Sequence, residues 1–387
     1  MKEQSPQVYK KDTSHSSAKR QDVSVAVKQP RSSNLELYRI ICMLMIVAHH
    51  FVVNSGLNSD CGPIHSNSGS ANSLFLSLFG AWGKTGINCF LMITGYFMCT
   101  SKITLRKFIK LMAQIYLYKM LLFPVFFIAG YEALSPLRLV ELVMPVWNLD
   151  TGFLSCFIVF WLTIPFLNIL VQNMTKRQHE LLLVLMLTMY SLLGSLPAFH
   201  IAINYVTWFG IIYFIASYIR LYPNALFDKK GLWGWLLLLS VLMSMASVVV
   251  MSKFCMNYYW LSDCNKILAV LVAICSFLWF NNMNIKYSKV INAFGAGTFG
   301  VLLIHANSDA MRTWLWKDTV DAVGHYTLPL GKLMLFSTAV VLVIFLVCNL
   351  IDQLRIATIE RWFFRWYDSK VAEKADTWIK IITGNNQ

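Results

Sequence analysis

The stretch NLELYRIICMLMIVAHHF, residues 34–51, decides the fold class of this chain. It is apolar over most of its length and is long enough to cross roughly 30 Å of hydrocarbon as a helix. Apolar stretches of similar character recur along the rest of the chain. The sequence therefore predicts an all-α, polytopic membrane protein with about ten transmembrane helices, at residues 35–53, 74–99, 108–130, 152–172, 181–197, 204–221, 232–251, 263–282, 290–306 and 333–351.

The composition agrees with a membrane protein. Hydrophobic residues make up 57% of the chain and charged residues 13%, whereas a soluble domain carries about 25% charged residues. Such hydrophobicity excludes intrinsic disorder for most of the chain. The 9 cysteines are scattered without a CxxC pair or a metal-ligand spacing, so we expect neither a disulfide framework nor a metal site.

Lysine and arginine are distributed unevenly between the predicted loops. If the N-terminus is cytoplasmic, the inner segments hold about three times as many of these residues as the outer ones, which predicts that both termini are cytoplasmic. Residues 1–34 are interpreted as a disordered basic tail, residues 35–351 as the membrane domain, and residues 352–387 as an amphipathic cytoplasmic segment. The net charge of +14 is therefore assigned to the inner surface of the lipid bilayer and not to a nucleic acid partner.

Ionisable residues in the first helix are expected to have a partner or a function, because inserting a charge at the centre of a spanning helix costs about 2.5–3.5 kcal/mol on insertion scales. Arg39 and His50 are separated by roughly three helical turns and share one stripe, whereas His49 is rotated by about 80° from it. Glu36 precedes Arg39 by one turn and can pair with it. Histidine is the side chain best suited to general-base catalysis near neutral pH. The residues alone leave open that Arg39 is a snorkelling anchor and His50 a histidine satisfied within the bundle.

The basic run SKITLRKFIK, residues 101–110, lies in the first predicted inner loop and contains Lys102, Arg106, Lys107 and Lys110. Arginine binds phosphate oxygens in a bidentate manner and lysine supplies point charge. The run is therefore interpreted either as a site for a phosphate-rich cytosolic ligand or as an ordinary positive flank of the helix.

Three further ionisable residues lie in or near predicted helices. Lys84 marks the start of the membrane part of the second helix. Lys119 falls near the middle of the third helix, where it either pairs with a carboxylate or faces the site. His305 lies near the outer end of the ninth helix, and the sequence leaves a structural and a functional role equally open.

Four stretches resemble the integral-membrane acyltransferase-3 family, the bacterial O-acetyltransferases of cell-surface glycans. They are the spacing from Arg39 to His50, GINCFLMITGYF (residues 86–97), the basic run, and FGAGTFGVLLIH (residues 294–305). The family often has a serine before a Gly-Tyr pair, whose tyrosine is Tyr96 here. Thr94 stands in place of that serine and also carries a hydroxyl group. The resemblance covers roughly residues 34–351. The chain resembles the stand-alone form of the family, which has no esterase-like domain after the last helix.

The resemblance implies a membrane O-acyltransferase that moves an acetyl or other short acyl group from acetyl-CoA to a hydroxyl of a cell-surface polysaccharide or lipid-linked glycan. His50 is then interpreted as the general base and Arg39 as a donor-site cation oriented by Glu36. The basic run is interpreted as the contact to the CoA phosphates. Further candidates for the site are Lys84, Thr94, Tyr96, Lys119 and His305. The expected location is the bacterial plasma membrane, as a multi-pass protein.

Two other classes of membrane protein share this composition. A secondary transporter, or a flippase for a lipid-linked sugar, often shows two related halves with broken helices, and no such repeat is visible here. A sensory or structural protein without chemistry would not need the ionisable groups in the first helix, given their insertion cost. The acceptor, the acyl chain, the side of the membrane on which the acceptor is modified, and the oligomeric state are left open.

Overall fold

Helices account for the regular structure of this chain. The computed structural model describes residues 32–371 except residue 102, residues 150–151 and residues 255–257. No strand occurs in this described part, so the predicted all-α fold class is confirmed. Lys102, almost all of the predicted N-terminal tail and the second half of the predicted C-terminal segment lie outside the described residues.

Every apolar segment predicted from the sequence is helical over most of its length. The α-helices are α1 (Ser33–Val53), α2 (Pro63–Ser66), α3 (Ala71–Gly80), α4 (Gly83–Met98), α5 (Leu105–Ile128), α6 (Pro136–Val143), α7 (Phe153–Asn173), α8 (Lys176–Met186), α9 (Tyr205–Leu221), α10 (Lys230–Ser252), α11 (Ile267–Asn281), α12 (Lys289–Ala296), α13 (Thr298–His305), α14 (Asp309–Arg312), α15 (Leu330–Arg355) and α16 (Arg361–Lys370). Short π-helical segments continue α8, α14 and α15, at Leu187–Leu192, Thr313–Thr319 and Ile356–Glu360.

The number of helices able to span a membrane is smaller than ten by length and composition. Within the described ranges, five helical stretches qualify: α1, α5, α7, α10 and Leu330–Ser369. A sixth is added if Lys289–His305 and Asp309–Thr319, which are bent by 94°, count as one span. Both α9 and α11 are apolar but shorter. The structure thus supports a membrane protein, while the count of ten spans and the cytoplasmic termini stay predictions.

Two predicted spans are interrupted. The segment at residues 74–99 divides into α3 and α4 just before Lys84, and the segment at residues 290–306 divides into α12 and α13 at Gly297. Glycines flank the first break, since α3 ends at Gly80 and α4 begins at Gly83. Glycine inside a helix costs backbone entropy and weakens it, so hydropathy alone overestimates the continuity of these two segments.

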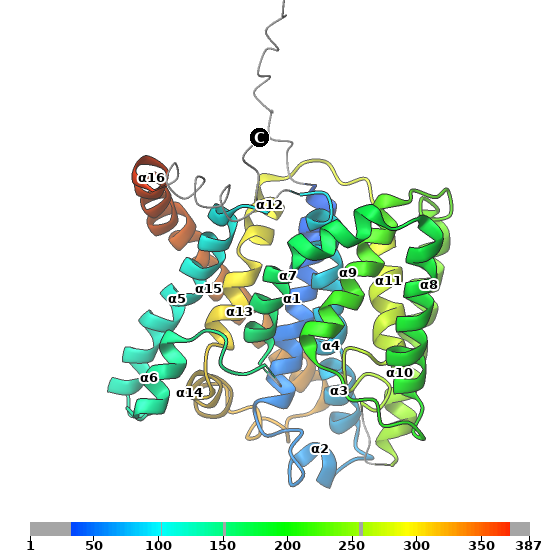
Figure 1. Cartoon of the computed structure of the whole chain (residues 1–387). Helices are drawn as coiled ribbons and strands as arrows, with labels where there is room; N and C mark the ends of the chain where they lie inside the picture. The colour runs from blue at the N-terminus through cyan, green and yellow to red at the C-terminus, as the bar shows by residue number, and fades with distance from the viewer. Residues whose placement is uncertain (1–31, 102, 150–151, 255–257, 372–387) are drawn as a thin grey trace, which may run out of the picture. The chain divides into compact units, whose positions relative to one another are not determined.

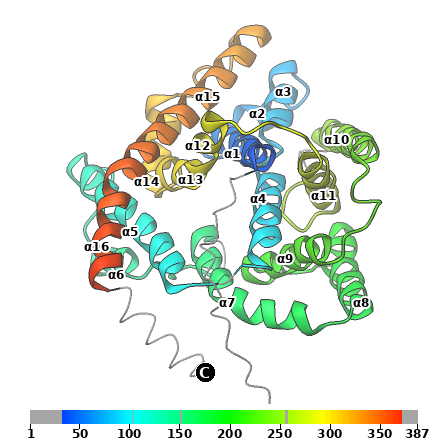
Figure 2. The same ribbon diagram turned by 90° about the horizontal axis from the view of Figure 1, so that it is seen from above.

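The first helix lies inside the protein. It packs against α3, α4, α11, α12, α13 and α15, and Figure 2 shows it in the middle of these helices. Its buried face includes Tyr38, Val47 and Phe51. At Gly295 of α12 an added Cβ would collide with the carboxylate of Glu36, so this glycine permits the close approach of the two helices. The ionisable residues of α1 are therefore surrounded by protein, as their insertion cost requires.

The two ends of the helix bundle carry different elements. Figure 1 shows α16 and the beginning of α12 at one end, and α2, α6 and α14 at the other. Because α5 starts at Leu105, Arg106 belongs to the first end. Lys119 lies 13 residues further along α5, which corresponds to about 20 Å at a rise of about 1.5 Å per residue. The basic run and the middle of the bundle are thus well separated along α5.

Candidate functional site

Two histidines from distant parts of the sequence meet at the end of α1. His50 Nδ1 lies 2.9 Å from His305 Nε2, and His305 Nδ1 lies 2.6 Å from the carbonyl oxygen of Val301. A carbonyl only accepts, so His305 Nδ1 donates to Val301, and the Nε2 atom of neutral His305 is an acceptor. His50 Nδ1–H then donates to His305. This network assigns to neutral His50 the tautomer in which Nε2 carries the lone pair.

His49 has different surroundings from His50. Its Nδ1 atom donates to the carbonyl oxygen of Gly80 over 2.6 Å. Its ring lies directly against Gly83, at the start of α4, where an added Cβ would collide with it. His49 therefore fastens α1 to the turn between α3 and α4.

A cavity of about 270 Å³ adjoins His50. Its wall is mostly apolar, formed by Ile46, Ile87, Ile115, Pro145, Gly152, Phe153, Leu154, Leu302, Leu303 and Ala306. Polar groups also reach it, from Lys119, Ser155, Asn307 and Arg312. A largely apolar pocket with a few convergent polar groups is typical of small-molecule sites. We call it the histidine cavity.

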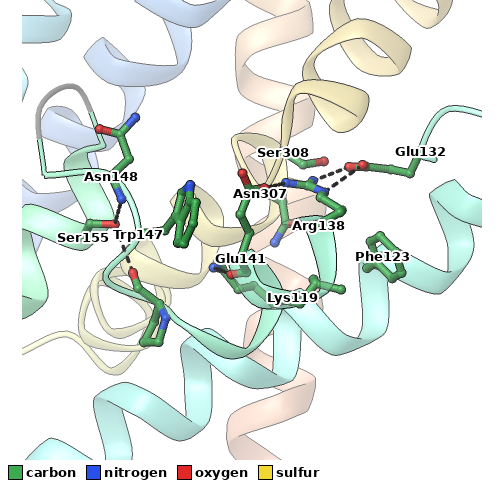
Figure 3. Close-up of a pocket in the computed structure, with 12 residues that line it drawn as sticks. Lys119, Phe123, Glu132, Arg138, Glu141, Trp147, Asn148, Ser155, Asn307 and Ser308 are labelled. Carbon is green, nitrogen blue, oxygen red and sulfur yellow. Dashed lines mark hydrogen bonds and ion pairs between the residues drawn. The ribbon is translucent and has the colours of Figure 1, made fainter. Parts of the chain in front are cut away.

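A second cavity of about 230 Å³ adjoins the first and shares Lys119, Pro145, Ser155 and Asn307 with it. Figure 3 shows its wall of polar side chains around Arg138. The remaining wall residues are Phe123, Glu132, Glu141, Leu142, Trp147, Asn148 and Ser308. We call it the polar cavity, and the four shared residues form its boundary with the histidine cavity.

Arg138 is held by two carboxylates in the polar cavity. Its Nε atom donates to Glu132 over 3.0 Å, and its Nη1 atom donates to Glu141 over 2.7 Å. Burial would lower the pKa of Arg138, but its hydrogen bonds to Glu132 and Glu141 outweigh this effect and the pKa is raised. The guanidinium therefore stays charged and fixes both carboxylates in place.

Two cations face the histidine cavity. Lys119 Nζ donates to the carbonyl oxygen of Glu141 over 3.2 Å, and Arg312 Nη1 donates to Asp309 over 2.6 Å. Cations fixed beside a dry cavity can stabilise negative charge that develops on a reacting oxygen. Lys119 was left undecided by the sequence, and the structure places it on the wall of both cavities.

Arg39 and Glu36 lie near the beginning of α1, about three turns from His50. The guanidinium of Arg39 lies 5.9 Å from the ring centroid of Phe90, in a cation–π contact. Glu36 is buried against Gly295. Neither residue lines the histidine cavity. The pairing of Glu36 with Arg39 and their role toward a donor stay predictions.

The basic run faces the C-terminal helix. Arg106 binds Asp368 through two hydrogen bonds of 2.8 Å, and its guanidinium lies 4.4 Å from the ring centroid of Phe364. Lys110 forms an ion pair with Glu360. Lys107 is exposed in the first turn of α5. Phe364 and its neighbour Tyr367 pack against the beginning of α5, so the predicted amphipathic segment covers the basic run over its described part.

A cavity of about 470 Å³ lies at this end of the bundle. It is lined by Arg106, Ile356, Glu360, Arg361, Phe364, Arg365 and Asp368. Three arginines thus face two carboxylates, which leaves a net positive lining. The sequence had not indicated Arg361 and Arg365, because basic residues near a membrane surface are also expected without any ligand. We call it the basic cavity.

Three other predicted candidates make structural contacts. Lys84 hydrogen-bonds the hydroxyl of Tyr205 and lies 3.6 Å from Asp263. Thr94 Oγ1 donates to the carbonyl oxygen one turn earlier in α4. The hydroxyl of Tyr96 accepts a 3.0 Å hydrogen bond from Arg220. None of these three residues lines the histidine cavity.

Several residues of the two adjoining cavities were missed by the sequence reasoning, chiefly Ser155, Arg312 and Trp147. The group of Glu132, Arg138 and Glu141 offered a signal, because a lone arginine between two acidic residues stands out in a predicted outer loop. Ser155 and Trp147 offered none, since both are common in membrane helices and at interfaces.

The described part of the chain is thus all-helical, with helices apolar enough to span a membrane and a histidine pair beside a largely apolar cavity. A family model described as an acyltransferase domain matches residues 32–351. The chain therefore belongs to the acyltransferase-3 family and is a membrane acyltransferase. No curated protein and no solved structure gives a significant match.

Proposed function

We propose that this protein is an O-acyltransferase of the bacterial plasma membrane that moves an acetyl or other short acyl group from acyl-CoA to a hydroxyl of a cell-surface polysaccharide or lipid-linked glycan. The observation that carries the proposal is the hydrogen bond from His50 to His305 beside the histidine cavity. It presents the basic nitrogen of His50 without a proton, which is the state that a general base needs.

The chemical step follows from the groups around the cavity. His50 Nε2 takes the proton of the acceptor hydroxyl while the hydroxyl oxygen attacks the thioester carbonyl carbon. The positive charges of Lys119 and Arg312 stabilise the negative charge that develops on the carbonyl oxygen. His305 accepts from the other ring nitrogen of His50 throughout. When the C–S bond breaks, His50 returns the proton to the leaving thiolate, and the enzyme is regenerated.

The donor is expected to bind at the basic end of the bundle. The basic cavity offers three arginines, which suits the phosphates of a CoA thioester. CoA carries its acyl group at the end of a long pantetheine arm, away from the phosphates. Such an arm can connect the basic cavity with the level of Lys119, about 20 Å away along α5. Arg39, on the same stripe of α1 as His50, is proposed as a further cation for the donor.

The proposal is tested with the purified protein in proteoliposomes. Acyl-CoA labelled in its acyl group is added together with an oligosaccharide acceptor extracted from the producing cells. Covalent label in the acceptor, found by mass spectrometry, supports the transferase. Movement of unmodified acceptor across the vesicle membrane without labelling would instead support a transporter or flippase. A second check is the mass spectrum of surface glycans from cells with and without the protein.

A further inference from the structure

The polar cavity contains aromatic and carboxylate side chains that the acyl transfer step itself does not require. The aromatic residue Trp147 lines it and is 47% exposed. The carboxylates of Glu132 and Glu141 keep acceptor sites beyond those used by Arg138, because a carboxylate has about four. An aromatic face beside fixed hydrogen-bond acceptors matches a sugar ring, which has apolar C–H faces and hydroxyls around its edge.

The size and position of the polar cavity suit one sugar next to the base. Its volume of about 230 Å³ equals the space of roughly seven to eight water molecules, on the scale of a single sugar ring. The boundary residues Lys119, Ser155 and Asn307 also face the histidine cavity. A hydroxyl of a sugar held in the polar cavity can therefore point across this boundary toward His50.

The face of α6 that lies opposite Arg138 is apolar. On α6, Leu137, Val140 and Val143 are 56%, 41% and 65% exposed, whereas Arg138 and Glu141 face the polar cavity. The end of the spanning helix α5 exposes an apolar face as well, with Val125 and Ile128 at 57% and 84%. Because α6 follows α5 after a short turn, we expect the two apolar faces to contact the same bilayer. This arrangement is typical of an amphipathic helix in the membrane interface.

We propose that the polar cavity is the subsite for the acceptor sugar, and that this sugar arrives attached to a lipid through the membrane interface at α6. The assignment rests on the proposed function. It narrows the acceptor to the lipid-linked form and names the residues that hold its sugar. A lipid anchor keeps the sugar at the depth of α6, so the wall formed by Arg138, Glu141 and Trp147 meets it directly.

The test uses the protein in proteoliposomes with acyl-CoA and two acceptors that carry the same sugars. One is the polyprenyl-phosphate-linked oligosaccharide from the producing cells, and the other is the oligosaccharide released from it by mild acid. Wild type should prefer the lipid-linked form. Trp147→Ala and Glu141→Gln should each raise the KM for that acceptor by about tenfold, while the KM for acyl-CoA stays unchanged. Trp235→Ala, on the 72% exposed outer face of α10, is the matched control.

A second pair of variants tests the membrane entry. Val140→Lys and Val143→Lys put charge on the apolar face of α6 and should lower transfer to the lipid-linked acceptor more than transfer to the released one. Equal use of both acceptors by wild type would overturn the lipid-linked entry. An active wild type together with an unchanged acceptor KM in Trp147→Ala and Glu141→Gln would overturn the subsite alone. A wild type that acylates neither acceptor would overturn the proposed function itself.

Discussion

Replacing His305 by phenylalanine tests whether His50 depends on its partner. The phenylalanine ring fills a similar volume but cannot accept the hydrogen bond from His50 Nδ1, now 2.9 Å long. His305 is fully buried, so water does not reach the vacated position. A buried donor without a partner costs about 1–3 kcal/mol. The productive tautomer of His50 becomes less favourable by this amount, which corresponds to a loss of about 5- to 150-fold in kcat at about 1.4 kcal/mol per tenfold.

The assay is the transfer rate in proteoliposomes, normalised to protein and measured at several acyl-CoA concentrations. His305→Phe should lower kcat and leave the KM for acyl-CoA unchanged, because the proposed site for the phosphates lies at the other end of the bundle. His305→Gln should recover part of the rate, since its side-chain carbonyl can accept from His50. Full activity of His305→Phe, or equal loss in His305→Phe and His305→Gln with unchanged folding, would refute the role given to the histidine pair.

Three further predictions concern the base, the basic end and the packing. His50→Ala should lower the transfer rate by about 10²–10⁴-fold, whereas His49→Ala, which loses the bond to Gly80 and the packing against Gly83, should cost much less. Activity should also fall with decreasing pH as His50 takes up a proton, and a more severe loss in His49→Ala would show that His50 is not the base. Arg106→Ala with Lys110→Ala should weaken acyl-CoA binding, more at low than at high salt, and Asp368→Asn should tighten it by at most a few-fold because exposed ion pairs are weak. Unchanged affinity of the double variant for acyl-CoA at low salt would mean that the basic run only sets the topology of the helix. Gly300→Ala should lower the melting temperature in detergent, because the added methyl group collides with buried Asp352 and overpacking costs about 1–3 kcal/mol. Gly210→Ala, whose Cβ meets open space, is the control, and equal melting temperatures of the two variants would contradict the collision.

The helices could be predicted well from hydropathy because the signal is local. The first predicted helix, residues 35–53, differs from Ser33–Val53 by two residues at its start. The separation of Arg39 from His50 and the different direction of His49 also follow from helical geometry. The breaks at Gly80 to Gly83 and at Gly297 could not be predicted from apolar content alone, because glycines and apolar residues coexist on both sides of each break.

The contacts that make the site are not local. His50 and His305 are 255 residues apart, and Arg106 and Asp368 are 262 residues apart. No periodicity connects such positions, so the sequence could nominate each residue but not the pairing. The carboxylates at residues 360 and 368 looked like parts of an amphipathic segment on the membrane surface, and their contact with the basic run depends on how α15 continues into α16.

That contact has a consequence for how the donor binds. Arg106 and Lys110 already form ion pairs with Asp368 and Glu360, so the phosphates of the proposed donor would have to compete with these carboxylates or share the cations with them. Glu360 also binds Arg355, which in turn binds the buried Asp352. Asp352 accepts a 2.7 Å hydrogen bond from Tyr118, next to Lys119 on α5. A chain of ion pairs and one hydrogen bond therefore links the basic cavity with Tyr118, the residue before Lys119 on α5. If the proposed donor phosphates displace Glu360 from Lys110, they act on the first member of this chain. Donor binding is then expected to affect the part of α5 that borders the histidine cavity.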